Sequence, residues 1–334
     1  MVLSPFLDSA GFAGMYSRGS LLNKALSMLR PVASRAAGLF RQENYDLVYA
    51  QREAMMFGPP IFEWLYSGAR HVPLVLDLDD ATYVPYVSPT YGRLASLLKF
   101  QGKTDALIDR SAIVICGNRF IAEYVRSRGR EATVVPTVVD LDAFYPEKRV
   151  AGAVTQLGWI GTPSTFPSLA SIFPVLERLA RTHRFVLKIV GSGVSEIRVP
   201  NVDVHVLDWG LEREVNDFRS IDIGLYPITT SSSANQQWIK GKSGFKAIQY
   251  MAVGVPFVMS PVGVCAEMGD HGRTHFNASD ENDWYNSLKA LLESPDLRAR
   301  MGAEGRKYAE ENYNVRDQAD VLADTLRSVV EDKG

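Results

Sequence analysis

The chain has 334 residues, of which 46% are hydrophobic and 22% charged, and its formal net charge is -2. This length suits one large domain or two ordinary ones, and the charge balance excludes the basic field expected of a nucleic-acid-binding protein. Cys116 and Cys265 lie far apart without metal-ligand spacing, so neither a disulfide framework nor a zinc site is expected. Apolar runs stay shorter than the roughly 20 residues that span a bilayer, and residues 1–12 lack signal-peptide features, so a cytoplasmic location is expected.

Short β-branched runs alternate with helical patterns along the whole chain. In the first half we predict strands at 46–50, 72–78, 113–116 and 133–136, and helices at 57–68, 91–110 and 119–128. In the second half we predict strands at 155–160, 185–190, 202–206, 223–226 and 256–259, and helices at 168–182, 212–221, 245–253 and 281–294. Buried strands separated by helices indicate parallel sheets, and two such runs of similar size indicate an α/β chain with two Rossmann-like domains.

The domain boundary is predicted near residues 142–152, where Pro146 and several charged residues interrupt the pattern. We therefore assign residues 1–146 to the first domain and 147–312 to the second, and two further amphipathic helices are predicted at 295–306 and 315–330. Residues 1–5 look like a strand and residues 8–14 like a loop. The first strand and glycine-rich turn of a complete Rossmann domain are thus expected to be absent or displaced.

The segment KGKSGFKAIQYMAVGVPFVMSPVG, residues 240–263, is the most informative motif. A loop that contains Lys240 and Lys242 leads into a predicted helix that begins with Lys246 in its first turn. Free amides at a helix N-terminus, a glycine for close approach (Gly244) and nearby lysines make a cradle for a diphosphate. The alternative is an ordinary loop–helix–strand unit whose lysines are solvated.

This motif resembles the donor-binding motif of glycosyltransferase family 4, the group 1 glycosyl transferases of the GT-B fold. Four other pieces resemble the same family in the same order: PTVVDLDAFYP (136–146), LGWIGTPST (157–165), LKIVGSG (187–193) and DIGLYPI (222–228). The resemblance implies two Rossmann-like domains that face each other across a cleft. It also implies that a C-terminal helix, residues 313–334, packs back on the N-terminal domain.

The resemblance implies a retaining glycosyltransferase that moves a sugar from a nucleoside-diphosphate sugar to a glycan or lipid-linked acceptor, in polysaccharide biosynthesis. The first domain would bind the acceptor and the second the donor. The residues that it places at the donor phosphates are Gly161, Thr162, Lys242, Ser243, Gly244 and Lys246. Nucleobase candidates are Gly191, Asp208 and Trp209, although Trp209 is equally explained as packing between a strand and a helix.

The chain departs from the family at the two glutamates that usually mark the donor site. Their places fall on Gly241 and Gln249, and residues 161–165 lack the family's basic pair. Gln249 is expected to hydrogen-bond the ribose as a neutral, weaker partner. Lys246 is expected to neutralise the departing diphosphate, so no metal and no cofactor are expected besides the donor substrate.

Three acids end a predicted strand of the first domain in VLDLDDATY, residues 75–83. Ligands bind at the carboxyl ends of parallel strands, so Asp79 and Asp80 are candidate catalytic residues. Asp79 stands where many family members carry a histidine, and the family's front-face mechanism argues against Asp79 as a nucleophile. The alternative is that these acids cap the following turn.

Three residues are acceptor-side candidates. Arg52 and Glu53 follow a predicted strand, and the alternative is that they pair with each other. Asn118 follows another strand, where a helix cap is the first interpretation.

Residues 17–41 contain five basic residues, Arg18, Lys24, Arg30, Arg35 and Arg41, and no acidic one. Leucines are interleaved with them, so the segment is predicted either to contact an anionic membrane at its cytoplasmic face or to form a solvated surface helix kinked near Pro31. Rival functions are a nucleotide-sugar-binding protein of impaired activity, a GT-B sugar-nucleotide epimerase and a phosphorylase. An epimerase would need clear acid/base residues in the cleft, and a phosphorylase would need a lysine in a pyridoxal-binding context. The sequence shows neither.

Overall fold

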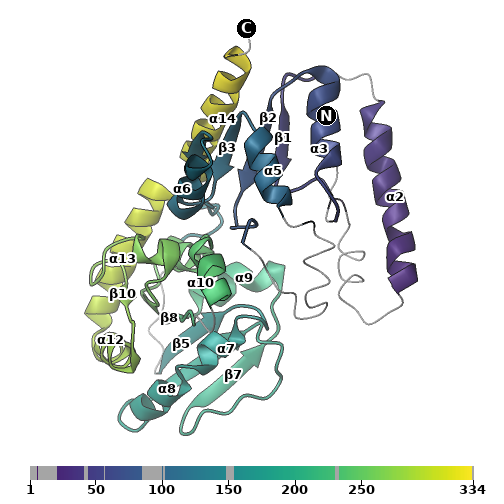
Figure 1. Cartoon of the computed structure of the whole chain (residues 1–334). Helices are drawn as coiled ribbons and strands as arrows, with labels where there is room; N and C mark the ends of the chain where they lie inside the picture. The colour runs from purple at the N-terminus through teal and green to yellow at the C-terminus, as the bar shows by residue number, and fades with distance from the viewer. Residues whose placement is uncertain are drawn as a thin grey trace. The chain divides into compact units, whose positions relative to one another are not determined.

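The computed structural model describes residue 6 and residues 21–40, 44–55, 57–84, 100, 102–147, 154–229 and 233–332. The chain forms two compact units (Figure 1). Unit 1 comprises Met1–Val135 together with Asp320–Gly334, and unit 2 comprises Pro136–Ala319. The last helix, α14 (Val315–Glu331), therefore begins in unit 2 and ends in unit 1.

Unit 1 contains a parallel sheet with the order β1 (Val48–Gln51), β2 (Leu74–Leu78), β3 (Ile113–Cys116), β4 (Ala132–Val134). Its helices are α2 (Leu21–Leu39), α3 (Ile61–Arg70), α5 (Lys103–Arg110) and α6 (Arg119–Ser127). All four residues of β3 are buried, as expected for a strand covered on both faces. Leu322, Leu326 and Val329 of α14 pack against Val75 and Ile115, so the C-terminal helix covers one face of this sheet.

Unit 2 contains a six-stranded parallel sheet with the order β10 (Phe276–Asn277), β9 (Phe257–Met259), β8 (Ile223–Tyr226), β5 (Thr155–Ile160), β6 (Phe185–Val190), β7 (Asp203–Leu207). Its helices are α7 (Phe166–Ala170), α8 (Phe173–Ala180), α9 (Glu214–Arg219), α10 (Ser233–Lys240), α11 (Phe245–Ala252), α12 (Glu281–Glu293) and α13 (Pro295–Asn312). β5 pairs with β6 on one side and with β8 on the other. Strands β6 and β7 are thus added on one side of β5, and β8 to β10 on the other. This reversal of strand order is the switch point of doubly wound dinucleotide-binding folds.

Two glycines fix how α11 packs on this sheet. A Cβ atom at Gly224 of β8 would lie 2.7 Å from the ring of Tyr250, and one at Gly158 of β5 would lie 2.2 Å from the side chain of Ile221. Tyr250 is fully buried and donates a hydrogen bond from its hydroxyl to the Gly158 carbonyl at 3.0 Å. The absence of a side chain at Gly224 makes room for the Tyr250 ring of α11 on β8, and the absence of one at Gly158 makes room for Ile221.

The predicted α/β class with parallel sheets in Rossmann-like units is confirmed. The single helix predicted at 168–182 is wrong, because the chain forms α7 and then a new helix, α8. Pro174 lacks the N–H that would continue the helix and is tolerated only in the first turn of a new one. α10 and β10 were not predicted, whereas the predictions for residues 1–5, 8–14 and 91–99 lie outside the described residues.

Candidate functional site

Hydrogen bonds of side-chain hydroxyl groups connect the segments that follow β5, β8 and β9. Ser168 Oγ lies 3.0 Å from Thr229 Oγ1 and accepts a hydrogen bond from the Thr229 amide at 3.2 Å. The Ile228 amide donates to Ser260 Oγ at 3.1 Å. These loops lie at the carboxyl ends of the strands where the order reverses, which is the ligand-binding position of open α/β sheets. The candidate site of unit 2 is therefore expected there.

The turns after β5 and β6 bring bare backbone to this edge. The Gly161 amide donates to the Val190 carbonyl at 3.0 Å, and the Gly191 amide donates to the Leu207 carbonyl at 2.9 Å. Gly191 has φ +79°, and a Cβ atom there would lie 2.4 Å from the Gly161 oxygen and 3.3 Å from Cβ of Trp209. The predicted residues Gly161, Gly191 and Trp209 are thus neighbours, and only glycine fits at 191.

Thr162 belongs to a turn that its own side chains close. Its amide donates to Thr165 Oγ1 at 3.0 Å, and its hydroxyl lies 2.9 Å from Ser164 Oγ. The Thr162 amide therefore has a partner within the turn. Asp208 follows β7, next to Trp209, and its carbonyl accepts a hydrogen bond from Arg213.

Gly244 is the N-cap of α11, with φ +67°. A Cβ atom there would lie 2.8 Å from Met268 Cε and 3.0 Å from Val264 Cγ1, so the glycine allows the helix to begin in a crowded place. Of the predicted phosphate residues beside it, Lys242 is exposed and lies 5.5 Å from the ring of Trp238, and Ser243 is half-buried. The helix N-terminus carries a positive end of the backbone dipole, which favours an anion.

Lys246 stands at the centre of a partly buried chain of polar contacts. Its ammonium donates to Gln249 Oε1 at 3.0 Å and lies 3.4 Å from Glu214 Oε1. The same Glu214 oxygen accepts a hydrogen bond from Trp209 Nε1 at 3.3 Å. Burial lowers the pKa of Lys246, and the negative charge of Glu214 opposes this shift. The chain of contacts Trp209–Glu214–Lys246–Gln249 therefore links the predicted base, phosphate and ribose residues.

Gln249 is fully buried, and its amide is oriented by this chain. The Lys246 ammonium is only a donor, so the amide oxygen faces it and the amide nitrogen faces away. Nε2 has no hydrogen-bond partner among the described residues. Leaving such a donor unpaired costs about 1–3 kcal/mol, which a bound oxygen atom would recover.

Glu214 was missed by the sequence analysis. It begins α9, directly after the turn Leu211–Arg213, and its side chain is only 14% exposed. An acid in the first turn of a helix that follows a strand's carboxyl end was the available signal. Its contact with Lys246, 32 residues later, depends on the tertiary fold and could not be read from local spacing.

In unit 1, each acid at the end of β2 has a partner that lies on β1 or directly after it. Arg52 forms a two-pronged ion pair with Asp79, at 2.5 and 2.6 Å, and also reaches Asp80 at 2.9 Å. Tyr49 donates to Asp77 Oδ2 at 2.5 Å, and burial raises the pKa of Asp77. Arg52 has φ +58°, which turns its side chain out of the strand register. Asp79 and Asp80 are thus held by a cation at the carboxyl edge of the sheet.

The expected pairing of Arg52 with Glu53 is wrong. Glu53 instead pairs with the buried Lys103 at 3.0 Å, because successive residues leave the strand in different directions. Asn118 caps α6, and its Oδ1 accepts a hydrogen bond from the Ile121 amide at 3.0 Å. A Cβ atom at Gly117 would lie 3.1 Å from Cα of Asp79, so the end of β3 passes close to the acid cluster.

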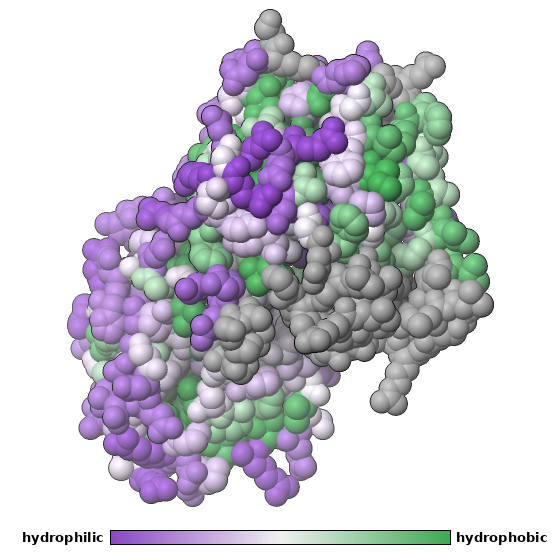
Figure 2. All heavy atoms as spheres, in the orientation of Figure 1, coloured by the Kyte–Doolittle hydropathy of each residue, from purple (hydrophilic) through white to green (hydrophobic). Residues whose placement is uncertain are grey.

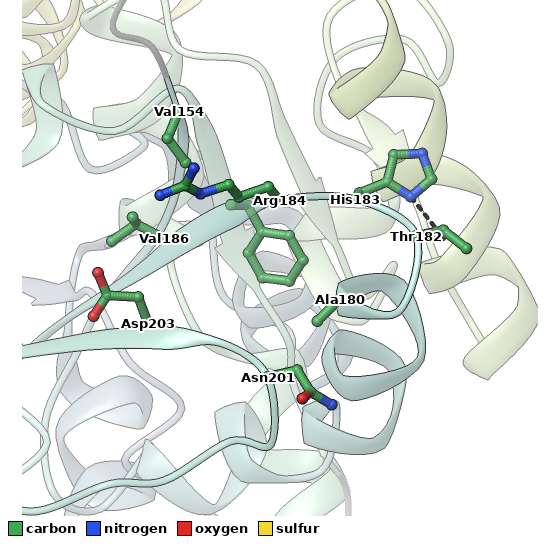
Figure 3. A pocket seen from close by; sticks show the side chains of 9 residues that line it. Val154, Ala180, Thr182, His183, Arg184, Val186, Asn201 and Asp203 are labelled. Atoms are coloured by element: carbon green, nitrogen blue, oxygen red, sulfur yellow. Dashed lines mark hydrogen bonds between the residues drawn. The ribbon is translucent and has the colours of Figure 1, made fainter.

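A pocket of about 280 Å³ lies elsewhere in unit 2 (Figure 3). Its lining includes Val154, Phe185 and Asp203, at the starts of β5, β6 and β7. Figure 3 shows His183 beside Thr182, 2.8 Å from its hydroxyl, at the rim. This is the amino edge of the sheet, opposite the edge where Lys246 and Gln249 lie, so the pocket is separate from the candidate site.

No cluster of three or more histidine, cysteine or acidic side chains in the described ranges has the arrangement of a metal site. None of the described helices combines the length and apolar character of a membrane span.

Comparisons with known proteins agree with this geometry. Residues 157–294 match the family model of the group 1 glycosyl transferases. No curated protein matches the sequence. Among solved structures, sucrose-phosphate synthase from Thermosynechococcus elongatus is 14% identical with a TM-score of 0.65, and the alignment covers 92% of this chain and 79% of that one.

Two further structures share the fold. HepE of Anabaena, in complex with UDP and glucose, is 15% identical with a TM-score of 0.63 over 89% of this chain and 82% of that one. A trehalose 6-phosphate synthase from Burkholderia multivorans is 15% identical with a TM-score of 0.60 over 97% of this chain and 80% of that one. Residues 157–294 of the second unit thus carry the sequence pattern of the group 1 glycosyl transferases, and the chain shares the fold of these solved structures.

Proposed function

We propose that this chain is a retaining glycosyltransferase that moves a sugar from a nucleoside-diphosphate sugar to a glycan or lipid-linked acceptor, without a metal ion. The observation that carries the proposal is the contact between the partly buried Lys246 and the fully buried Gln249 in the first turns of α11. It combines a cation for a diphosphate with an unpaired donor for a hydroxyl oxygen, at the carboxyl edge of the sheet.

The donor diphosphate would lie at the N-terminus of α11, against Gly244 and the glycine turn at Gly161. There the helix dipole and the Lys246 ammonium favour an anion. Lys242, Ser243 and Thr162 would border the same space. A phosphate oxygen would compete with Glu214 for the ammonium, at the 3.4 Å position that the carboxylate now holds.

The nucleoside would extend from the diphosphate toward Gly191 and Trp209. Gln249 Nε2 would donate to a ribose oxygen, where family members use a glutamate. Trp209 is 49% exposed, so its ring is available to a nucleobase, and Asp208 lies beside it. HepE of Anabaena was solved with UDP and glucose, which makes UDP the first nucleotide to test.

Bond cleavage leaves negative charge on the departing nucleoside diphosphate. Lys246 and the amides of α11 are fixed before the reaction, so they would stabilise that charge without reorganising. The positive charge of the lysine makes a metal ion unnecessary in this proposal. Retention of configuration is supported by the likeness of residues 240–263 to family 4.

The acceptor would bind to unit 1, where Asp79 and Asp80 are candidate contacts for the acceptor hydroxyl or the sugar. Arg52 holds Asp79 through two hydrogen bonds and would fix its direction. Glu53 and Asn118 would act on the acceptor indirectly. Glu53 would hold Lys103 in place, and Asn118 would fix the start of α6. We place the reaction in polysaccharide biosynthesis, in the cytoplasm at the inner face of a membrane.

A nucleotide-sugar-binding protein without turnover is the second candidate. The absence of both family glutamates, at Gly241 and Gln249, favours it. Incubation with a panel of nucleotide sugars, followed by measurement of released nucleoside diphosphate, separates the two. The transferase proposal predicts slow donor hydrolysis with at least one sugar. Tight nucleotide binding without turnover of any donor, in the presence of glycan and lipid acceptors, would establish the binding protein instead.

A further inference from the structure

Helix α2 of unit 1 exposes a row of apolar side chains and buries one of its arginines. Its arginine Arg35 is only 8% exposed, whereas Leu26 and Leu29 are 55% and 62% exposed and Phe40, just beyond the helix, is 85% exposed. A surface helix of a globular protein normally shows the opposite pattern. The outward face of α2 therefore needs an explanation.

The buried side of α2 is held by polar contacts to the neighbouring helix and loop. Arg35 Nε donates to the Ala54 carbonyl at 3.2 Å, and the Ala54 amide donates to the buried Glu63 of α3 at 2.7 Å. Tyr66 of α3 donates to the Arg35 carbonyl at 2.7 Å. These contacts fix which side of α2 faces unit 1, so the exposure of the leucines follows from the fold.

The exposed residues form one stripe along the helix. Leu26, Leu29, Ala33, Ala37 and Phe40 follow each other at spacings of three and four residues, and each is exposed. Residues at such spacings share one face of a helix. In Figure 2 the right-hand side of the molecule, where α2 lies in Figure 1, is largely hydrophobic. Ile61 and Leu65 of α3 are each 45% exposed as well.

The charges of this segment select the partner. Residues 17–41 carry five basic residues and no acidic one, in a chain whose net charge is -2. Arg35 faces unit 1 and is buried, so it does not belong to the outward-facing charge. Arg30 is exposed on α2, next to Leu29 in the sequence. A second copy of this chain would bring two such basic segments together in a two-fold interface, which like charges disfavour. An anionic lipid surface satisfies both the apolar stripe and the positive charge.

We propose that the α2 stripe, formed by Leu26, Leu29, Ala33, Ala37 and Phe40, docks unit 1 on an anionic membrane surface. The helix lies in the plane of the interface, with the stripe among the lipid chains and Arg30 at the headgroups. This rests on the proposed function only for its purpose, which is to bring unit 1 to a lipid-linked acceptor; the docking itself does not require turnover.

The test is co-sedimentation of the full chain with vesicles of phosphatidylcholine, alone and mixed with phosphatidylglycerol. We expect the wild type to bind the anionic vesicles, and binding to weaken as salt is added. The double variant Leu26→Gln, Leu29→Gln should lower the partition coefficient by at least about tenfold, because two exposed leucines no longer enter the lipid. Both side chains are exposed, so the melting temperature should stay near that of the wild type.

The matched control is Leu211→Gln, which replaces a 71% exposed leucine of unit 2 and should bind vesicles like the wild type. Wild-type protein that stays in solution with both vesicle types would overturn the proposal, as would a double variant that binds as well as the wild type. The proposal would also be overturned, in favour of self-association, if the wild type were a dimer and the double variant a monomer.

UDP affinity measured on the same samples keeps the two proposals apart. Vesicle binding without any nucleotide binding would contradict the proposed function alone, and nucleotide binding without vesicle binding would contradict the docking surface alone.

Discussion

The Lys246 ammonium donates to Gln249 Oε1 at 3.0 Å and thereby leaves Gln249 Nε2 buried without a partner among the described residues. The lysine thus decides which end of the amide is presented to a ligand. In the proposed donor site, a glutamate at this position would accept hydrogen bonds from ribose hydroxyls, whereas the glutamine would donate one from Nε2. The proposed contact therefore differs from the glutamate contact in polarity as well as in charge.

Replacing Gln249 by alanine should weaken UDP binding. We expect about a tenfold loss of affinity, equivalent to one neutral hydrogen bond of roughly 1.4 kcal/mol, measured by titration calorimetry. The control is Gln318→Ala on α14, which should leave the affinity unchanged. Equal affinity in the wild type and Gln249→Ala would remove Gln249 from the donor site.

Because Glu214 holds the position at Lys246 that we propose for a phosphate oxygen, Glu214→Gln should bind UDP several-fold more tightly at neutral pH. The pH dependence should shift as well. Burial lowers the pKa of Lys246 below its usual 10.5, while Glu214 raises it. A lysine is charged below its pKa, so UDP affinity should fall as pH rises toward 10.5, and at a lower pH in Glu214→Gln. Superimposable affinity–pH curves for the two proteins would contradict this role.

Asp79→Asn should separate the two units functionally. Donor contacts are assigned to unit 2 and Asp79 to unit 1, so we expect transfer to fall by at least about tenfold, while the UDP dissociation constant changes by less than about twofold. Steady-state transfer and calorimetry measure the two effects. The control is Asp109→Asn, which alters a carboxylate of α5 that pairs with Arg128, and it should retain transfer. A parallel loss of UDP affinity in Asp79→Asn would argue for a structural role.

His275 should make the protein sensitive to mild acid. It is buried, stacks on Phe257 at a centroid distance of 5.3 Å and contacts Asn277 at 3.0 Å. Burial lowers the pKa of His275 from 6.5 to about 4. The unfolded chain takes up this proton near pH 6.5 but the folded chain only near pH 4, so stability is full above this window and falls as pH drops through it.

The expected slope is roughly 1 kcal/mol of unfolding free energy per pH unit within that window. Chemical denaturation at several pH values measures it, and His275→Gln should flatten the curve. An unchanged slope in the variant would assign the acid sensitivity to other groups.

The sequence predicted the sheets well because their strands are β-branched runs bounded by turns, and nine of these runs correspond to strands of the structure. It missed β10, which has only two residues, and α10, whose SANQQWIK sequence lacks a clear apolar stripe. It divided 168–182 wrongly because Pro174 restarts the helix.

The site was harder to predict than the fold. The glycines and lysines of residues 240–263 could be recognised in the sequence because they lie close together in one continuous motif. The contact of Glu214 with Lys246 was not predictable, because it joins α9 to α11. The direction of the Gln249 amide depends on how the Lys246 side chain is oriented within α11, which residue spacing alone does not give. The same reason explains the wrong pairing of Arg52, whose partner Asp79 lies 27 residues away on the next strand.

We propose that the edge of unit 2 around Lys246 binds the diphosphate of a nucleotide donor. The decisive experiment is calorimetric titration of the wild type and Lys246→Ala with UDP, and then with the other nucleoside diphosphates. We predict that at least one nucleoside diphosphate binds, and that Lys246→Ala lowers its affinity by about ten- to a hundredfold, as expected for a charged hydrogen bond. Failure of every nucleoside diphosphate to bind the wild type, or equal affinity in Lys246→Ala, would contradict the account.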